Sequence, residues 1–413
     1  MSQFYDLASL VVIPSGYKAS TIYAQKPLTT DGQLSFTRAS TATRVNSSGL
    51  IEAVASNVPR LDYLGSTCPR LLLEGQRTNK CPNSANYGNS LINVTVTRNV
   101  VSAPTNSVEA DRVLDDNANG EHLLAESFDS ILNAQPYTVS CFFKADGTGG
   151  RAVIRFYVGS WTYAVYNLAN GTITATDGVG TASIQNYGSG WYRCILTATA
   201  STDYTPMTTQ LGIANSSNNF SYQGATSLGV YFWGYQAEQG AYVSSIIPTA
   251  GASATRGADA ASKTGISSLI GQTEGVAFID FVWNGLTGIG SYPRIIELAT
   301  DSSNIIQLFS ISGTTSWNWE IINGGVVQFT GSSTMALGRN KIAIGYKLND
   351  MVVYKNGALI ASDATCTVPA TSALGVTGTF NGAGGAQLAA SVNQTLLFKT
   401  RLTNAQLAEL TTL

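Results

Sequence analysis

Two long series of strand-like segments dominate the pattern of apolar and polar positions. From about residue 85 to 250, short apolar or alternating runs recur every 10 to 15 residues or so, with Gly, Asn and Asp between them. A stretch rich in Pro, Gly, Ala and Ser at about 247–271 interrupts this pattern. The second series then runs from GVAFIDFVW to QTLLFKT. Each series predicts one β-sandwich.

The two ends of the chain differ from this pattern. Residues 1 to about 80 carry short apolar runs broken by several prolines, so this segment cannot form a core alone. We expect it to lie extended against the following domain, another subunit or a larger particle. At the other end, LTNAQLAEL predicts a helix with Thr403 as its N-cap and with Leu407 and Leu410 facing inward.

The chain is too long for one hydrophobic core, since it has 413 residues. The predicted fold class is all-β, with two β-sandwich domains of the jelly-roll or concanavalin-like kind behind an extended N-terminal segment. The predicted division is 1–80 for the N-terminal module, 81–258 for the jelly-roll sandwich, and 259–413 for the concanavalin-like sandwich with its short C-terminal helix.

Composition and charge exclude several partners. Charged residues make up 12% of the chain and the formal net charge is -2, so there is no basic stripe for nucleic acid. No apolar run approaches the ~20 residues that span a bilayer, and we expect no membrane insertion. The five cysteines are odd in number and contain no C-x-x-C pair, so we expect reduced thiols, although Cys68 and Cys81 could bridge a loop.

Three blocks near the N-terminus resemble the N-terminal module of tailed-bacteriophage tail-fibre and other virion structural proteins. They are FYDLASLVVIPSGYKASTIYAQKP, LSFTRASTATRVNSSGLIEAVASNVPRLDY and PRLLLEGQRTN, and together they cover residues 5–79. The second block is the most specific. Its matching positions are Arg38, Thr41, Arg44, Val45, Gly49, Leu50, Ile51, Pro59 and Arg60.

Two further strings carry resemblances. YFWGYQAEQGAYVSSIIPTAGASATRGAD is similar to the closing signature of a phage-associated sandwich whose layout is that of carbohydrate-binding jelly rolls. KIAIGYKLNDMVVYKNGALIAS resembles laminin-G and concanavalin A-like lectin sandwiches, through Val352, Tyr354, Asn356 and Gly357. This second match is a signal of fold, and fold alone does not identify a ligand.

The resemblances imply a virion component that is assembled in the bacterial host cytoplasm. On this interpretation residues 1–80 anchor the chain to other virion proteins of the capsid, portal or tail, and the lectin-like domains contact host surface polysaccharide. A homo-oligomer, with a trimer as the default, would supply avidity. A purely structural decoration or tail-assembly protein without a ligand is the alternative, and a polysaccharide depolymerase is the third possibility.

Four arginines of the N-terminal module are candidate anchoring or interface residues: Arg38, Arg44, Arg60 and Arg70. Guanidinium groups suit ion pairs at interfaces, so they could pair with carboxylates of a neighbouring subunit. The other interpretation is that they bond backbone carbonyls of the module's own loops. The sequence does not separate the two.

Aromatic pairs are the candidate carbohydrate-binding residues, because flat apolar rings stack on sugar rings. Trp317 and Trp319 are two residues apart on one predicted strand and share a face, as do Trp161 and Tyr163. For Trp317 and Trp319 the alternation with polar residues favours the sandwich core. Trp161 and Tyr163 follow a Gly-Ser turn, which favours exposure.

The sequence predicts no enzyme. The strand GVAFIDFVW offers only Asp280, whereas glycoside hydrolysis normally needs two carboxylates. His122 is the only histidine, so any triad or multi-histidine metal site would depend on it. It follows Asn119 and Gly120, and we interpret it as a polar residue beside a turn.

One segment matches a calcium-loop pattern. DDNANGEHLLAE fits D-x-[DN]-x-[DN]-G-x5-E through Asp115, Asn117, Asn119 and Glu126. Its flanks are strand-like and not helical, and a β-hairpin turn explains the same Asn and Gly residues. We therefore expect no cofactor, with Ca²⁺ at these residues kept as a hypothesis.

Overall fold

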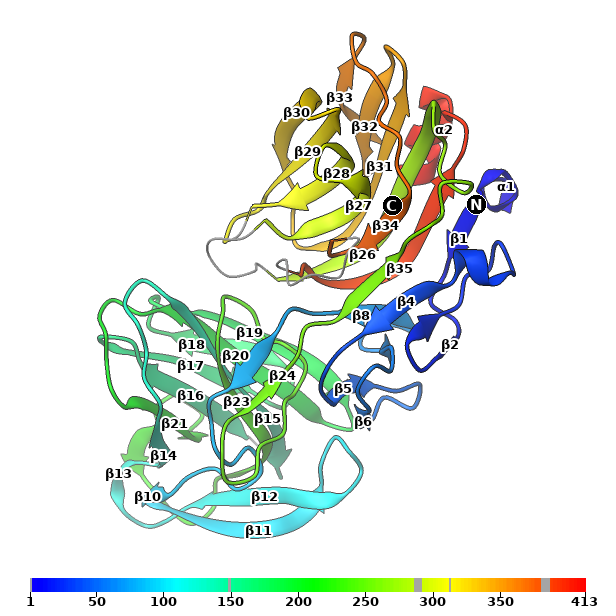
Figure 1. Ribbon diagram of the computed structural model, residues 1–413. Coiled ribbons are helices and arrows are strands. Elements are labelled where there is room, and N and C mark those ends of the chain that lie inside the picture. Colours follow the sequence, from blue (N-terminus) through cyan, green and yellow to red (C-terminus); the bar gives the residue numbers. More distant parts are fainter. Residues whose placement is uncertain (1, 148–149, 286–291, 312, 380–386) are drawn as a thin grey trace. The chain divides into compact units, whose positions relative to one another are not determined.

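The computed structural model describes residues 2–147, 150–285, 292–311, 313–379 and 387–413 (Figure 1). The chain divides into two compact units. Unit 1 comprises Met1–Arg44, Ala53–Gln76 and Gly257–Leu413, and unit 2 comprises Val45–Glu52 and Arg77–Arg256. In the part of the chain that is described, no helix is long and apolar enough to cross a membrane.

Unit 1 is a β-sandwich built from antiparallel sheets. The first sheet has the order β33 (Ala358–Asp363), β32 (Met351–Lys355), β31 (Gly338–Lys347), β26 (Glu274–Gly285), β35 (Ala389–Phe398), β8 (Arg70–Leu73), β7 (Leu61–Asp62), and β1 (Leu10–Val12) also pairs with β35. The second has the order β2 (Tyr17–Lys18), β3 (Thr21–Ile22), β4 (Leu34–Thr37), β25 (Ala260–Lys263), β34 (Ala373–Val376), β27 (Arg294–Asp301), β28 (Asn304–Ser310), β29 (Ser316–Asn323), β30 (Val326–Thr334).

The N-terminal segment belongs to this sandwich. Strand β1 pairs with β35, β8 pairs with the same strand, and β4 pairs with β25. Leu10, Leu34 and Phe36 join the same buried core as Phe281 and Ile344. The segment 1–80 is therefore not the separate module that the sequence predicted. These short strands pair with strands of the C-terminal sandwich, and their side chains pack in the core of that sandwich.

Unit 2 is a second antiparallel sandwich. One sheet, here called the platform sheet, has the order β10 (Ser90–Ile92), β14 (Leu123–Phe128), β21 (Met207–Ala214), β16 (Arg151–Tyr157), β17 (Trp161–Asn167), β18 (Thr172–Thr176). The other has the order β11 (Val94–Ser102), β12 (Val108–Asp115), β23 (Gly229–Gln239), β15 (Pro136–Asp146), β20 (Trp191–Thr199), β19 (Thr181–Gly188). Cys141 and Cys194 are opposite each other on β15 and β20 and are fully buried, as small hydrophobic residues would be.

Short elements complete the fold. The remaining strand pairs are β13 (Asn119–Glu121) with β22 (Ser221–Gln223), β24 (Ala254–Arg256) with β9 (Arg77–Asn79), and β5 (Ala42–Val45) with β6 (Ile51–Val54). The helical elements are α1 (Ser2–Leu7), the 3-10 turn η1 (Thr30–Gly32) and α2 (Asn404–Thr411). The prediction of an all-β protein with two sandwiches is confirmed. The predicted boundary after residue 258 lies two residues from the observed change of unit after Arg256.

Helix α2 confirms the predicted C-terminal helix and its cap. The Thr403 side chain accepts a hydrogen bond from Gln406 N at 3.2 Å, and the Gln406 side chain accepts one from Thr403 N at 2.9 Å. This is a capping box, and Leu407 and Leu410 are buried as predicted.

The cap leads to a first prediction. Replacing Thr403 by alanine removes an acceptor from the first turn of α2, and we expect a loss of about 1 kcal/mol in the free energy of unfolding of unit 1. Urea denaturation followed by circular dichroism measures it. Thr403→Ser keeps the hydroxyl and should retain most of the stability, so an equal loss in both variants would contradict the role of the cap.

Candidate functional site

A row of aromatic rings, two of them exposed, lies on the platform sheet of unit 2. Trp161 on β17 is directly opposite Tyr157 on β16, and their ring centroids are 5.8 Å apart with an interplanar angle of 77°. Tyr204, in the loop before β21, packs against Tyr157, and the centroids of these two rings are 4.4 Å apart. Trp161 is 40% exposed and Tyr204 is 37% exposed. We call these three residues the aromatic row.

Arg155 holds the Trp161 ring in place. Its guanidinium lies over the indole at 4.6 Å from the ring centroid and over the Phe220 ring at 5.2 Å. Both terminal nitrogens donate to the Glu121 carboxylate, at 2.9 and 2.7 Å, and Nε donates to Gln210. A bidentate pair of this kind fixes the plane of the guanidinium. The indole therefore rests on a rigid support and keeps much of its surface for solvent.

Hydroxyl groups lie beside the aromatic row on the neighbouring strands. Ser127 on β14 is opposite Thr208 on β21, and their oxygens are 3.0 Å apart. Thr208 is two residues before Gln210, which is opposite Arg155, so these side chains share the outer face of the platform sheet. The site thus combines flat apolar surface with hydroxyl groups that keep lone pairs for further hydrogen bonds.

Tyr163, the predicted binding partner of Trp161, does not belong to the aromatic row. Tyr163 shares its strand and face, but its ring packs against Phe220 at 5.4 Å and joins a small cluster with Val153 and Val165. The sequence prediction missed Tyr157 and Tyr204. Tyr157 could have been found, because it is two residues beyond Arg155 in an alternating strand, whereas Tyr204 lies in a loop with no periodic signal.

The second aromatic pair lies in the core of unit 1, which corrects the carbohydrate-binding prediction for these residues. Trp317 is 0% exposed and Trp319 is 5% exposed. Their rings contact each other at 5.5 Å, and Trp319 contacts Phe329 at 5.9 Å. Both belong to the hydrophobic core between the sheets, so neither ring can stack on an external ligand. This agrees with the core alternative that the sequence pattern favoured.

Two of the four candidate interface arginines are buried inside unit 1. Arg38 donates to the carbonyl oxygens of Ser40 at 2.9 Å and Ala55 at 2.6 Å, and to Asp259 at 3.0 Å. Its side chain and that of Asp259 are fully buried. The interface hypothesis is therefore wrong for Arg38, because its hydrogen bonds hold loops of its own unit.

Arg60 occupies the same buried cluster. It donates to the Thr43 carbonyl oxygen at 3.1 Å, to Glu74 at 2.8 Å, and to Asp259. Burial alone would lower the pKa of Arg60, but the charges of Asp259 and Glu74 raise it above its ordinary value. The Arg60 side chain is fully buried and bonded within its own unit, so the interface hypothesis is wrong for Arg60 as well.

The other two arginines are half-buried. Arg44 lies over the Tyr17 ring at 5.6 Å, and Arg70 is opposite Asp62 in the β7–β8 pair. Their interface role stays a prediction.

The proposed calcium loop is not formed, which corrects that hypothesis. Asp115 ends β12, Asn117 is in a turn, Asn119 begins β13, and Glu126 is on β14. The Asp115 carboxylate accepts backbone N–H groups of residues 225, 227 and 228 at 3.2, 2.8 and 2.9 Å. Glu126 instead accepts from Gly88 N at 3.1 Å. Across the described residues, no group of three or more His, Cys, Asp or Glu could hold a metal ion.

His122 is buried between strands, unlike the turn-flanking position predicted for it. Its Nδ1 lies 2.7 Å from the Asn93 carbonyl oxygen, and its Nε2 lies 3.2 Å from that of Tyr222. The ring also packs on the Tyr222 ring at 4.2 Å. These contacts assign His122 a structural role.

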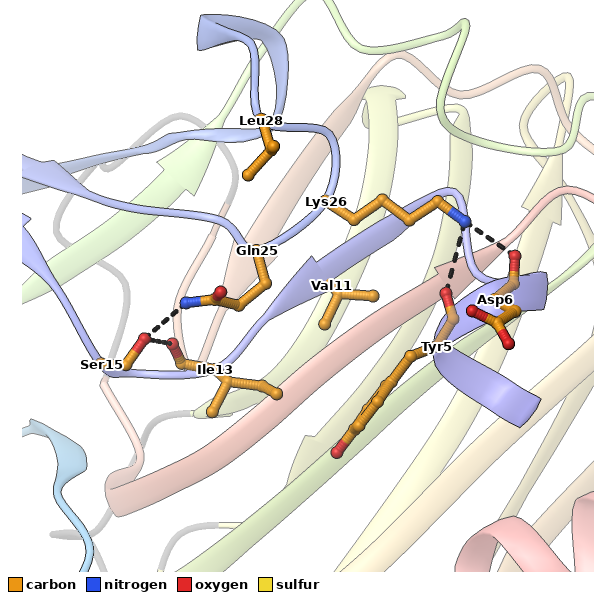
Figure 2. A pocket seen from close by; sticks show the side chains of 8 residues that line it. All are labelled: Tyr5, Asp6, Val11, Ile13, Ser15, Gln25, Lys26 and Leu28. Carbon is orange, nitrogen blue, oxygen red and sulfur yellow. Dashed lines mark hydrogen bonds between the residues drawn. The ribbon is translucent and has the colours of Figure 1, made fainter. Parts of the chain in front are cut away.

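A pocket lies in the N-terminal segment of unit 1. Figure 2 shows this pocket of about 600 Å³, which is lined by Tyr5, Asp6, Val11, Ile13, Ser15, Gln25, Lys26 and Leu28. The side chains of Lys26, Gln25 and Ser15 already have hydrogen-bond partners. Lys26 Nζ donates to the carbonyl oxygens of Tyr5 and Asp6 at 3.3 and 2.7 Å, and Gln25 donates to Ser15 at 2.5 Å.

Tyr5 is similarly engaged. Burial and the nearby charge of Asp280 raise the pKa of its hydroxyl, which donates to Gln394 at 2.9 Å. The pocket therefore offers the apolar surface of Val11, Ile13 and Leu28, while the hydroxyls of Tyr5 and Ser15 are already hydrogen-bonded.

The fold and the site define an all-β sandwich protein with an exposed aromatic row. No protein-family model matches the sequence, and no curated protein matches it. Among solved structures, the CBM40 module of a Ruminococcus gnavus IT-sialidase, bound to alpha2,3 sialyllactose, has a TM-score of 0.30 and 15% identity over 36% of this chain and 87% of that chain.

Domain 4 of a Geobacillus stearothermophilus GH43 arabinanase in complex with arabinotriose has a TM-score of 0.30 and 14% identity over 42% of this chain and 81% of that one. A heptameric pentraxin of Limulus polyphemus has a TM-score of 0.25 and 13% identity over 33% and 69%. At these TM-scores the likenesses carry no conclusion about ligands.

Proposed function

We propose that this protein is a non-enzymatic structural component of a tailed-bacteriophage virion that adheres to host surface glycan through the aromatic row of unit 2. The observation that carries the glycan part is the exposed Trp161 ring, held by Arg155 and flanked by Tyr157 and by hydroxyl groups. Stacking on a fixed ring costs little conformational entropy when a sugar binds. The phage part is supported by the resemblance of residues 5–79 and of the string that ends at Asp259.

Binding at one such site is expected to be weak, because a shallow face on a sheet buries little of a ligand. Many copies on one particle would raise the overall avidity without any new contact. This is the reason to propose a homo-oligomer, with a trimer as the default, attached to capsid, portal or tail proteins. On this proposal the protein is located in the virion.

The contacts of Asp280 and His122, the two residues considered for catalysis in the sequence analysis, support a non-enzymatic role. Asp280 accepts two hydrogen bonds from Arg339, at 3.1 and 2.8 Å, and one from Asn393 at 2.8 Å. It is therefore held as part of an ion pair. The single histidine, His122, is buried among backbone carbonyls.

Glycan binding is tested by immobilising host surface polysaccharides and measuring retention of the full chain. We expect Trp161→Ala to weaken binding by about tenfold or more, as for an anchor residue in an interface. Tyr292→Ala is the matched control, because Tyr292 is an exposed aromatic residue of unit 1. Equal retention of wild type and Trp161→Ala would contradict the proposed site, and a blank result across host polysaccharides would contradict the glycan function. Electron microscopy of intact particles tests the virion location.

A further inference from the structure

The cations around the aromatic row are paired with acids. Both terminal nitrogens of Arg155 are bound to Glu121, at 2.9 and 2.7 Å. Lys80 pairs at 2.6 Å with Asp129, which lies two residues beyond Ser127. Asp203, next to Tyr204, accepts a hydrogen bond from the backbone N–H of Asn133 at 2.7 Å and adds a further negative charge. The charge near the row is therefore balanced or slightly negative.

The next cation on the same strand is too distant to change this balance. Arg151 lies six residues before Tyr157 on β16, which is about 20 Å at ~3.3 Å per residue. Its Nη1 donates to Asn218. Since exposed charges are screened over roughly 8 Å at physiological salt, Arg151 contributes little attraction at the row.

The remaining polar groups match uncharged hydroxyls. The Ser127 and Thr208 hydroxyls are bonded to each other at 3.0 Å, and their remaining lone pairs can accept from the hydroxyls of a sugar. A carboxylate or phosphate is usually held by the fork of an arginine. At this site the Arg155 fork is occupied by Glu121, and the approach of an anion would also meet the Glu121 and Asp203 carboxylates.

We propose that the aromatic row binds an uncharged glycan, made of hexopyranose units that carry no carboxylate, phosphate or sulfate. This inference rests on the proposed glycan function and specifies the ligand class of the same site. The C–H face of one pyranose unit stacks on Trp161, and hydroxyls of the next units along the glycan reach Thr208 and Ser127, which lie two and three strands from Trp161 in the platform sheet. Tyr204, at the other end of the row, contacts a neighbouring unit of the same chain.

The test is affinity electrophoresis of the full chain in gels that contain dextran, laminarin, yeast mannan, polygalacturonate or polysialic acid. We expect retardation by at least one neutral polysaccharide, unaffected by added NaCl, and a loss of about tenfold in affinity in Trp161→Ala. Glu121→Gln should add retardation by the acidic polymers, because it leaves Arg155 without its counter-charge.

The outcomes are distinguishable. Salt-sensitive retardation by polygalacturonate or polysialic acid alone, abolished by Trp161→Ala, would overturn the uncharged ligand and leave the proposed glycan function intact. No retardation by either class would overturn both. Retardation by a neutral polymer that Trp161→Ala leaves unchanged would overturn the assignment to the aromatic row. Melting curves of each variant, with Tyr292→Ala as control, separate loss of binding from loss of folding.

Discussion

Replacing Asp259 by asparagine is expected to lower the free energy of unfolding of unit 1 by about 3–5 kcal/mol, the range for breaking a buried ion pair on one side. The Asp259 carboxylate accepts hydrogen bonds from Arg38 at 3.0 Å, from Arg60, and from the backbone N–H of Glu74 at 2.9 Å. Both guanidinium groups are fully buried. A guanidinium is effectively always protonated in proteins, so neither arginine can relieve the loss by releasing a proton.

Urea denaturation of the full chain measures this effect as a shift of the unit 1 transition. Asp350→Asn is the matched control, since Asp350 pairs with Arg401 at 3.1 Å but is about half exposed. An exposed pair contributes about 0–1 kcal/mol, so the control should unfold close to the wild type. A shift in Asp259→Asn no larger than in the control would show that the buried cluster adds no net stability.

The buried cluster of Arg38, Arg60 and Asp259 links two of the sequence strings that resemble phage proteins. Arg38 and Arg60 come from the N-terminal block, and Asp259 ends the string that closes the middle series of strands. Arg38 and Asp259 are 221 residues apart in sequence. Their ion pair holds the N-terminal loops to the start of the C-terminal sandwich. These three residues of the two strings therefore stabilise unit 1.

Local signals in the sequence were sufficient for much of the architecture. The run GVAFIDFVW lies within β26, and its buried pattern matches a strand covered on both faces. In the Y-x-N-G string, Asn356 and Gly357 have φ values of 50° and 86°, as a tight hairpin turn between β32 and β33 requires. Strand patterns and turn residues of this kind depend on a few neighbouring residues, so they can be predicted from a short stretch of sequence.

Features that depend on distant residues could not be read in this way. Strands β1, β4 and β8 are three or four residues long, and only their pairing with β35 and β25 makes them strands. In the candidate site, strand alternation placed Trp161 and Tyr163 on one face correctly. It could not show that Tyr204 reaches the row from a loop, or that Phe220 draws Tyr163 into a separate cluster.

Trp317 is buried in the core of unit 1 whereas Trp161 is exposed, so their replacement is expected to have different effects on stability. We expect Trp317→Ala to lower the free energy of unfolding of unit 1 by about 3–5 kcal/mol, because it leaves a cavity in a packed core. Trp317→Phe should cost much less. The indole N–H of Trp317 is buried without a hydrogen-bond partner among the described residues, so the phenyl ring loses volume but no hydrogen bond.

Trp161→Ala provides the contrast, since it removes an exposed ring and its contact with Arg155, worth about 1 kcal/mol or less at an exposed site. Urea titrations of the three variants separate the two roles. A core tryptophan changes stability and leaves glycan retention of the folded protein intact, whereas Trp161 changes retention and leaves stability nearly intact. If Trp317→Ala unfolded like the wild type, the Trp317 ring would have to lie outside the core, and this pair would return to the candidate binding residues.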